Sequence, residues 1–355
     1  MRENREVRAA EAGALIVAVY TILVLSSGMV ALADFATLLG FYLQASFSLW
    51  LIMGFVALVV TLYRNRPVNG VGPGPVAVVV RAIAARWERD RFVSMFWPPL
   101  LFATLMASFN AFKQMVLPAA GFRFDPLFAA LDRMLFLGND PWRAMHSAIG
   151  SPNAVLVIDR AYHGWFLPMA FGVLMCAWLP ASTYRLRNQY LLSYVAIWIG
   201  IGSVLAFLLP SAGPCFYEHF VGPSAHFAGL ARDLQAAQAA TGAQLATLSN
   251  QEGLLRLFGG TGLQVGAGIS AMPSVHNGLA VLFAIAAYRA NKWLGYGFGA
   301  YAVLIWFGSV YLGWHYAIDG FVSAGSTFAI WRVTGRLMNR FEASSSAPES
   351  EPVTA

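Results

Sequence analysis

The chain has 355 residues, of which 58% are apolar and only 11% are charged. Soluble domains usually carry about 25% charged residues, so this composition excludes an ordinary soluble protein and indicates a polytopic membrane protein. The net charge of +6 needs no nucleic-acid partner, because membrane topology and attraction to anionic lipid account for it.

Runs of about 20 apolar residues recur along the chain, and each can cross a hydrocarbon core of ~30 Å. We therefore predict an all-α integral membrane protein with about eight transmembrane helices. The predicted spans are 13–33, 36–62, 93–117, 154–180, 190–209, 272–288, 293–313 and 316–335. The first run is too long for a signal-peptide core and a second span follows it directly, so we expect a retained helix.

Basic residues predict the orientation of these spans. On one side of the eight-span topology lie 16 of the 23 basic residues, namely Arg2, Arg5, Arg8, Arg64, Arg66, Arg81, Arg86, Arg89, Arg91, Arg185, Arg187, Arg289, Lys292, Arg332, Arg336 and Arg340. By the positive-inside rule that side is cytoplasmic. We expect a multi-pass protein, as in a bacterial inner membrane, with both termini cytoplasmic and with His276 and His315 at the extracytoplasmic face.

The first 92 residues are predicted to form a separate N-terminal unit. Its two spans carry no charged residue, and we interpret them as lipid-facing accessory helices without a site. The segment 76–91 is too short and too basic to span, so we expect an amphipathic helix on the cytoplasmic surface. At the other end of the chain, residues 341–355 are predicted to be a disordered cytoplasmic tail.

The third span ends near the outer interface with Lys113. This lysine could extend to the lipid headgroups, or it could reach into a phosphate site. The following residues, 121–152, have one-sided helical spacing and predict short helices along the outer interface. Arg123, Asp125 and Asp132 in this segment would be available to a site or simply solvated.

The fourth span opens with an unusual density of polar groups. Asp159, Arg160, Tyr162 and His163 either line a water-filled cavity or include a structural pair of Asp159 and Arg160.

The longest unspanned region is the outer loop 210–271. Residues 231–258 predict one or two amphipathic helices. The glycines between Gly259 and Gly268 follow no predicted strand, so a dinucleotide or phosphate-binding loop is excluded by context. We expect them to form a mobile hinge beside the site.

Two histidines stand at the outer ends of predicted spans. His315 and Asp319 are four residues apart, so in a helix they share one face. Asp319 can then hold one ring nitrogen while the other attacks phosphorus or takes a proton. The alternative is a helix-end ion pair. The sequence PSVH at 273–276 places His276 at the mouth of another apolar segment, which favours a site.

These motifs resemble those of the type 2 phosphatidic acid phosphatase superfamily. Within it, residues 271–278 and 314–319 resemble the two histidine motifs of the inositolphosphotransferase branch, which includes inositol phosphorylceramide synthases. Residues 214–217 resemble that branch's Pro-Pro-Trp-Tyr element only loosely. The resemblance covers six spans from about 93 to 335, and it implies a six-helix catalytic domain at 93–340 preceded by two accessory helices.

The sequence departs from the phosphatase pattern at three places. No Arg-Pro follows Lys113 at the expected distance, Ser309 stands where those phosphatases have an arginine, and Val275 replaces a glycine. The departures point away from a generic lipid phosphate phosphatase.

The resemblance implies that His315 attacks phosphorus to form a phosphohistidine, that Asp319 orients it and that His276 protonates the departing alcohol. This scheme needs no metal and no cofactor, and the sequence has no HExxH motif or cysteine cluster. The candidate phosphate- and substrate-binding residues are Ser274, Lys113, Arg123, Tyr162, His163 and Tyr217.

The leading hypothesis is a membrane phosphotransferase that moves a phosphorylated head group between lipid-linked alcohols at the outer leaflet, with a lipid or polyol as acceptor. One alternative is a phosphatase of a lipid or polyprenyl phosphate. An alternative of another class is a transporter or lipid-binding membrane protein. The two halves of the chain show no repeat of broken helices, which argues against transport.

Overall fold

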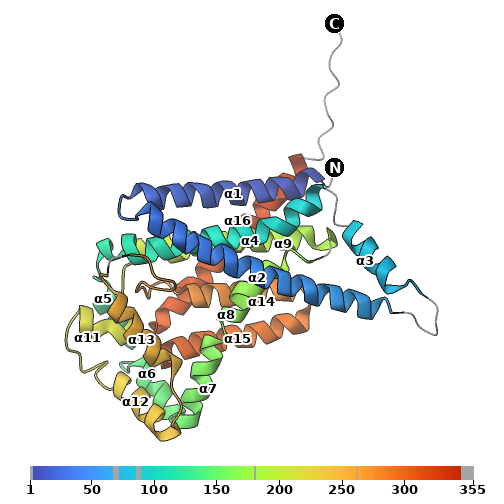
Figure 1. The fold of residues 1–355 in the computed structure, drawn as a ribbon. Helices are drawn as coiled ribbons and strands as arrows, with labels where there is room; N and C mark the ends of the chain where they lie inside the picture. Colours follow the sequence, from blue (N-terminus) through green and yellow to red (C-terminus); the bar gives the residue numbers. More distant parts are fainter. Residues whose placement is uncertain (1–2, 67–71, 85–88, 180, 261, 345–355) are drawn as a thin grey trace.

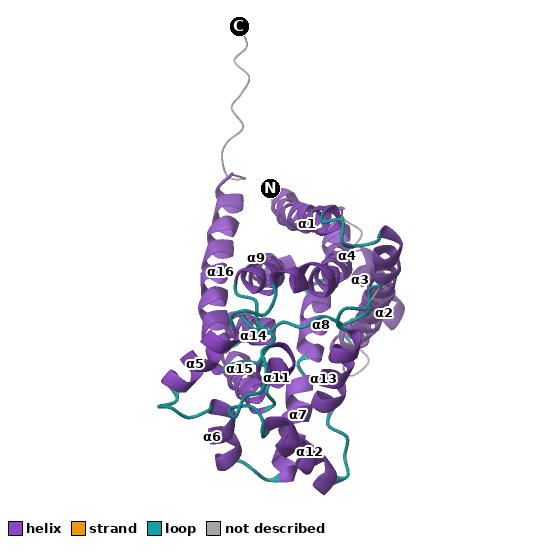
Figure 2. Ribbon diagram, turned by 90° about the vertical axis from the view of Figure 1, so that its left-hand side faces the viewer, coloured by secondary structure: helices purple, strands orange, loops and turns teal. Residues whose placement is uncertain are grey.

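The computed structural model describes residues 3–66, 72–84, 89–179, 181–260 and 262–344. Within these ranges every regular element is a helix, and Figure 2 shows only helices and loops. The prediction of an all-α membrane protein is confirmed.

The first two helices, α1 (Glu3–Ser26) and α2 (Leu32–Arg64), both pack against α4 (Arg89–Ala111). In addition, α1 contacts α9 (Tyr184–Ala196) and α2 contacts α8 (Phe166–Met175). Large apolar side chains on the outer faces of α1 and α2 are exposed, among them Leu15, Leu23, Leu51 and Phe55. This exposure is what we expect of helices that face lipid.

Five helical segments are long and apolar enough to cross a membrane. They are Arg8–Ser26, Leu32–Arg64, Val93–Ala120, Tyr184–Leu208 and Lys292–Tyr311. Helix α14 (Val275–Ala290) is apolar but shorter, while α16 (Ala317–Ser344) is long but carries Asp319, Arg332 and Arg336. The total of eight spans therefore remains a prediction.

The predicted fourth span, 154–180, is not one continuous helix. It consists of α7 (Pro152–His163) and α8, separated by a turn at Gly164. Pro168 explains the break, because its ring would clash with the carbonyl of Gly164 in a continuous helix and it has no N–H to donate there. Apolar composition predicts burial of this segment but not its continuity.

Two helices change their winding near the outer end of the bundle. Helix α4 continues as the π-helical η1 (Phe112–Val116) and the 3₁₀-helical η2 (Leu117–Ala120), and α9 continues as the π-helical η4 (Ile197–Leu205) and α10 (Ala206–Leu208). Single π turns inside α-helices often mark functional sites, because they re-aim the side chains that follow.

The centre of the bundle is α14, which packs against α9, α15 (Lys292–Tyr311) and α16. Figure 2 shows α14 among these helices. Its packing face is closely filled, with Leu279, Ala280 and Leu282 fully buried. The first turn of α14 carries His276, so a helix packed against three others positions one of the two predicted catalytic histidines.

Short helices gather at one end of the molecule, at the lower left of Figure 1. They are α5 (Asp125–Leu135), α6 (Pro141–Ala148), η5 (Pro214–Phe216), α11 (Tyr217–Phe220), α12 (Leu230–Thr241) and α13 (Ala246–Leu257), which we call the outer cover. The short helices predicted in 121–152 and in 231–258 are confirmed. Two further short elements lie outside the outer cover. Helix α3 (Pro75–Ala84) occupies the first part of the predicted interfacial segment 76–91, of which residues 85–88 lie outside the described ranges. A 3₁₀ turn, η3 (Ala181–Thr183), precedes α9.

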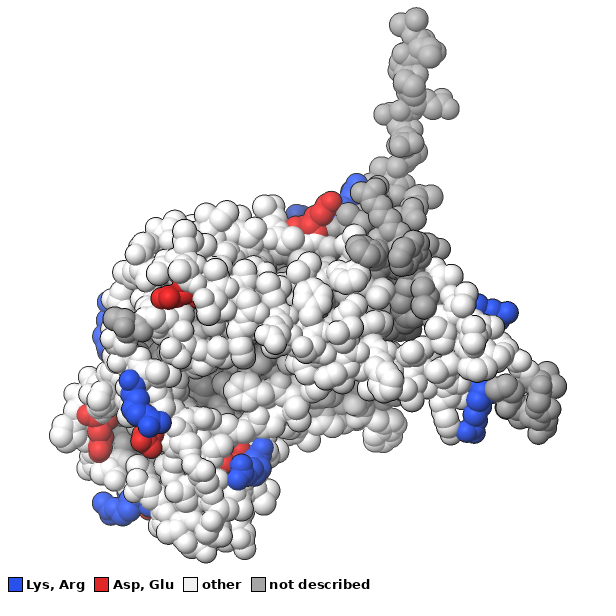
Figure 3. Space-filling view, viewed as in Figure 1, with Lys and Arg blue, Asp and Glu red and all other residues white. Residues whose placement is uncertain are grey.

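Charged residues on the face shown in Figure 3 gather over the outer cover and at the opposite end, with a broad uncharged surface over α1 and α2 between them. The start of α1 and the end of α16 both lie at the end opposite the outer cover (Figure 1). This arrangement fits the predicted topology, in which both termini share one side.

Candidate active site

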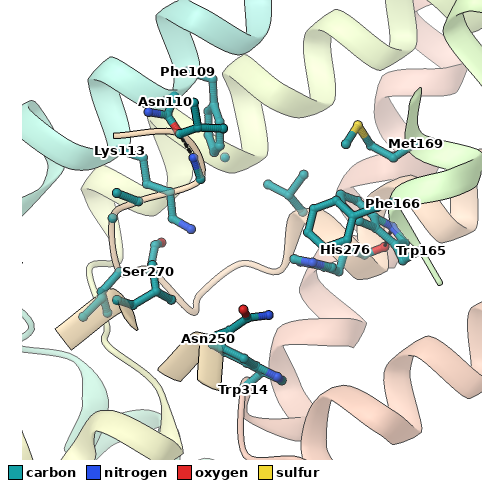
Figure 4. Close-up of a pocket in the computed structure, with 18 of the residues that line it drawn as sticks. Phe109, Asn110, Lys113, Trp165, Phe166, Met169, Asn250, Ser270, His276 and Trp314 are labelled. Carbon is teal, nitrogen blue, oxygen red and sulfur yellow. Dashed lines mark hydrogen bonds between the residues drawn. The ribbon is translucent and has the colours of Figure 1, made fainter. Parts of the chain in front are cut away.

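A cavity of about 550 Å³ opens where the helical bundle meets the outer cover. Figure 4 shows polar groups directed into it from four different segments: Lys113 from η1, Ser270 from the loop before α14, Asn250 from α13 and His276 from α14. His315 also lines the cavity, on the loop between α15 and α16. Both predicted catalytic histidines therefore face one space.

The predicted pair of His315 and Asp319 is present, although it does not arise from helical spacing. His315 lies two residues before α16 begins, and its backbone N–H donates to the carbonyl of Ser309 at 3.1 Å. The Nδ1 atom of His315 lies 3.1 Å from Oδ2 of Asp319, and the two residues are 5% and 0% exposed. The loop, rather than a helix face, directs the imidazole toward the cavity.

This loop turns sharply at Gly313, whose φ is +76°. A side chain there would also collide with Leu230 of α12. Glycine is therefore required for both the left-handed backbone and the close approach of the outer cover. The segment 312–316 is consequently held between the bundle and α12.

The charge state of His315 suits a nucleophile. Burial, together with the positive charge of Lys113, lowers the pKa of His315 to about 3. The imidazole is therefore neutral at pH 7. Its Nδ1 atom is paired with Asp319 and the ring also interacts with the backbone of Ala271, so Nε2 is the nitrogen that lies away from the carboxylate.

His276 has a different environment, made of aromatic rings. Its ring centroid lies 4.0 Å from that of Trp165 and 5.3 Å from that of Tyr162. The planes of the Tyr162 and His276 rings differ by only 17°, so these two rings are stacked. The Trp165 indole N–H donates to the backbone carbonyl of His276 at 3.1 Å. The ring centroids of His276 and His315 are 6.0 Å apart, so both can reach one phosphoryl group.

Two buried aspartates of α5 fix the loop that carries His315. Asp132 accepts hydrogen bonds from the N–H groups of Ala317 at 2.7 Å and Ile318 at 2.9 Å, which caps α16. Asp125 accepts from the Tyr316 hydroxyl at 2.7 Å. These residues are 0% (Asp125) and 4% (Asp132) exposed, so they are neither solvated nor directed at a substrate, but hold the site in place.

Asp125 also binds a second segment beside the cavity. It accepts hydrogen bonds from the N–H groups of Ala212 at 2.8 Å and Gly213 at 2.9 Å. The next residues begin the loosely matched element 214–217, where the Cys215 N–H donates to the Gly313 carbonyl at 2.9 Å. This element therefore supports the histidine loop from behind.

The glycine-rich segment before α14 is bound to α4 and η1. Asn110 donates to the Gln264 carbonyl at 2.7 Å and accepts from the Gly266 N–H at 2.8 Å. Gln114 donates to the Gly262 carbonyl at 2.6 Å and accepts from the Gln264 N–H at 2.9 Å. These reciprocal bonds differ from the free hinge that we expected, and they make the segment a wall of the cavity.

Not all predicted substrate-binding residues reach the cavity. Lys113, Tyr162 and His163 line it. Arg123 is exposed and lies over the ring of Phe124, outside the cavity lining. Sequence reasoning missed Asn250 and Ser270, because an isolated amide or hydroxyl in an amphipathic segment gives no signal.

The other two predicted binding residues have structural contacts. Ser274 is fully buried, and its hydroxyl accepts from the Asn277 N–H at 3.3 Å, so it caps α14. Tyr217 packs its ring against Phe227 with centroids 4.9 Å apart. Among the residues that the structure describes, no group of three His, Cys, Asp or Glu is placed to hold a metal ion.

Fold and site together define a class of protein: a helical membrane protein in which two histidines face one cavity and one of them, His315, is paired with the buried Asp319. A family model described as PAP2 superfamily matches residues 126–333, which is more than half of the chain. The chain therefore belongs to the PAP2 superfamily. No curated protein gives a significant match, and neither does any solved structure.

The match includes His276, His315 and Asp319 but not α1, α2, α4 or Lys113. Members of this superfamily are phosphatase-type enzymes that act on phosphate esters, so membership suggests phosphatase or phosphotransferase activity for this chain.

Proposed function

We propose that the protein is a membrane phosphotransferase that moves a phosphorylated head group between lipid-linked alcohols at the outer leaflet. The observation that carries the proposal is that His315 and His276 face a single cavity whose lining includes both polar side chains and apolar side chains of the bundle helices. A substrate that joins a phosphate to an apolar chain matches both kinds of lining.

Several apolar side chains of the lining come from the helices of the bundle. They include Phe102 and Met106 of α4, Met169 of α8 and Trp198 of η4. These side chains belong to segments that we expect to lie in the hydrocarbon region, so an acyl or isoprenoid chain could enter directly from the lipid. Lys113 reaches into the cavity from η1, where its ammonium group would bind the phosphate oxygens.

Transfer would occur in two displacements. In the first, Nε2 of His315 forms a bond to phosphorus while the bond between phosphorus and the departing alcohol oxygen breaks, and His276 gives its proton to that oxygen. In the second, an acceptor hydroxyl gives its proton to His276 as its oxygen attacks phosphorus and the bond to His315 breaks. Asp319 stabilises the charge on His315 in the intermediate. Water as acceptor would make the same site a phosphatase.

The proposal is tested by incubating purified protein with a radiolabelled phospholipid, with and without an alcohol acceptor. We expect a transferred head group when the acceptor is present and a labelled phosphoenzyme when it is absent. Free phosphate or a free phosphorylated head group as the main product in both cases would instead support the phosphatase. The absence of both phosphoenzyme and product would favour a transporter or lipid-binding protein.

A further inference from the structure

The outward side of α5 is apolar, although this helix belongs to the outer cover. Its inward side buries Phe128 and Asp132 against the bundle. On the opposite side and in the turn that follows, large apolar side chains are exposed, up to 75% for Met134 and 92% for Leu137. These side chains, which we call the α5 apolar face, are Leu127, Met134, Leu135 and Leu137.

Helix α12 shows what a water-facing surface of the outer cover looks like. It is of similar length and buries Leu230 and Leu234, but its exposed side carries Arg232, Asp233 and Gln235. This is the usual pattern of a helix that packs on one side and faces water on the other. Because α5 has a comparable buried side and an apolar exposed side, its exposed side matches an apolar partner rather than water.

The turn after α5 holds Leu137 outward in a defined conformation. The Gly138 N–H donates to the Arg133 carbonyl at 2.7 Å, and the Asn139 N–H donates to the Phe136 carbonyl at 3.0 Å. Among the described residues other than glycine, Leu137 is the one with a positive φ, +54°. A left-handed backbone costs free energy in any residue that has a Cβ atom, and such positions gather where a segment makes a functional contact.

The position of α5 identifies lipid as the partner. Asp132 joins α5 to the first turn of α16, through the N–H groups of Ala317 and Ile318. About 6 Å further along α16, Phe321 begins an exposed apolar stripe that continues at Phe328. In Figure 1, α5 and the connection between α1 and α2 lie at the same end of the bundle, and Figure 2 shows α5 at the edge of the molecule beside α16. The α5 apolar face therefore adjoins the surface that the bundle is expected to present to lipid.

We propose that the α5 apolar face inserts into the membrane leaflet on the side of the outer cover, at the boundary between headgroups and acyl chains. Amphipathic interfacial helices bury their apolar side about 5–10 Å deep at this boundary. Because α5 also carries Asp125 and Asp132, which hold the loop of His315, the lipid surface anchors the helix that supports the active site. This inference concerns membrane contact and is independent of whether the reaction is transfer or hydrolysis.

Fluorescence quenching tests the insertion on the full-length protein in phosphatidylcholine nanodiscs. In a background without Cys176 and Cys215, the single substitution Leu137→Cys is labelled with an environment-sensitive fluorophore. We expect lipid brominated in its acyl chains to quench this label. Gln235→Cys on the exposed side of α12 is the matched water-facing control, and Leu15→Cys on the exposed side of α1 is the lipid-facing control.

Aqueous iodide provides the opposite measurement. Its quenching constant should be severalfold smaller for the label at position 137 than for the label at position 235. Iodide quenching equal to that at position 235, without quenching by brominated lipid, would overturn the proposal. Protection from both quenchers would also overturn it, because a protein partner or a second copy of the chain would then cover the face. Thermal unfolding of each labelled variant checks its folding.

Hydrogen exchange provides a second test without a label. The exchange of α5 amides is compared in nanodiscs between the unmodified protein, Leu137→Glu and Gln235→Glu. Burial of one leucine side chain changes an equilibrium constant by at least about tenfold, so Leu137→Glu should speed exchange in α5 by about that factor. Gln235→Glu should leave this exchange unchanged. Equal exchange in all three proteins would show that lipid does not hold α5, and would overturn the anchoring.

Discussion

His315 and His276 have unequal surroundings, and this difference supports the two roles that we propose for them. His315 is paired with a fully buried carboxylate, which can stabilise an imidazolium that carries a phosphoryl group. His276 lies among the rings of Trp165 and Tyr162, and in the described part of the chain its ring donates no hydrogen bond to a carboxylate. The geometry therefore fits a nucleophile and a proton donor, respectively.

Replacing each histidine by glutamine should separate these roles. We expect His315→Gln to abolish hydrolysis, transfer and the phosphoenzyme. His276→Gln should lower the rate by about 10² to 10⁴, the usual contribution of a general acid, and a substrate with a nitrophenol leaving group should recover part of it. His219→Gln, on α11 outside the cavity lining, is the control. Phosphoenzyme in the His315 variant but not in the His276 variant would reverse the assignment.

Asp132 makes the stability of the folded state depend on pH. Burial raises the pKa of Asp132 to about 7, well above its ordinary value, so the folded state holds this proton more tightly than the unfolded state. The contribution of Asp132 to the free energy of unfolding is therefore largest below pH ~4, where the folded and unfolded states are both protonated. It is lost as the pH rises through about 7.

We therefore expect the unfolding temperature to fall between pH 6 and pH 8.5, and to fall less in Asp132→Asn. Intrinsic tryptophan fluorescence on heating measures both values. Glu252→Gln, at a carboxylate of α13 that is 71% exposed and contacts Arg256, should keep the pH dependence of the unmodified protein. An identical pH dependence in Asp132→Asn would show that Asp132 is not the group responsible.

At the scale of elements, the contact between the glycine-rich segment and η1 governs the position of Lys113. Gly268 has a φ of +98°, and a Cβ atom there would lie 2.8 Å from the Lys113 carbonyl oxygen. Gly266 has a comparable φ of +74° but open space around it. Comparing alanine substitutions at Gly268 and Gly266 therefore separates the effect of backbone strain from the effect of displacing Lys113.

Gly268→Ala should weaken phosphate binding by about tenfold, because η1 must shift and one charge-assisted hydrogen bond is worth at least ~1.5 kcal/mol. Gly266→Ala should lower the unfolding temperature with a smaller effect on the dissociation constant of phosphate. Calorimetry with inorganic phosphate measures this constant. Equal effects of the two substitutions on binding would argue that Lys113 does not bind phosphate.

The elements also show what sequence can and cannot predict. The histidine motifs and the short helices of the outer cover were predictable, because spacing and amphipathicity are local. The partners of Asp125 and Asp132 were not, because they are backbone N–H groups and a tyrosine hydroxyl up to 191 residues away in sequence. The contribution of α2 was also missed, since Tyr42 lines the cavity from a helix that composition alone marks as lipid-facing.

At the scale of the whole molecule, the basic residues predict that the outer cover is extracytoplasmic. Ala236 of α12 and Ser182 of η3 are both exposed and suit single cysteine substitutions in a background without Cys176 and Cys215. An impermeant thiol reagent should label Ala236→Cys in intact cells, and Ser182→Cys only after the membrane is opened. The reverse pattern would place the catalytic cavity on the cytoplasmic side.

The aspartate contacts have a consequence for how readily this protein can change. Asp125, Asp132 and Asp159 each bind two consecutive backbone N–H groups of a distant segment. Because the partners are main-chain groups, these hydrogen bonds do not depend on which side chains those positions carry, although Gly213, with a φ of +101°, requires glycine. Side chains of the cavity lining that make none of these contacts can thus be exchanged while the scaffold stays fixed, which makes the site a good starting point for redesign toward other substrates.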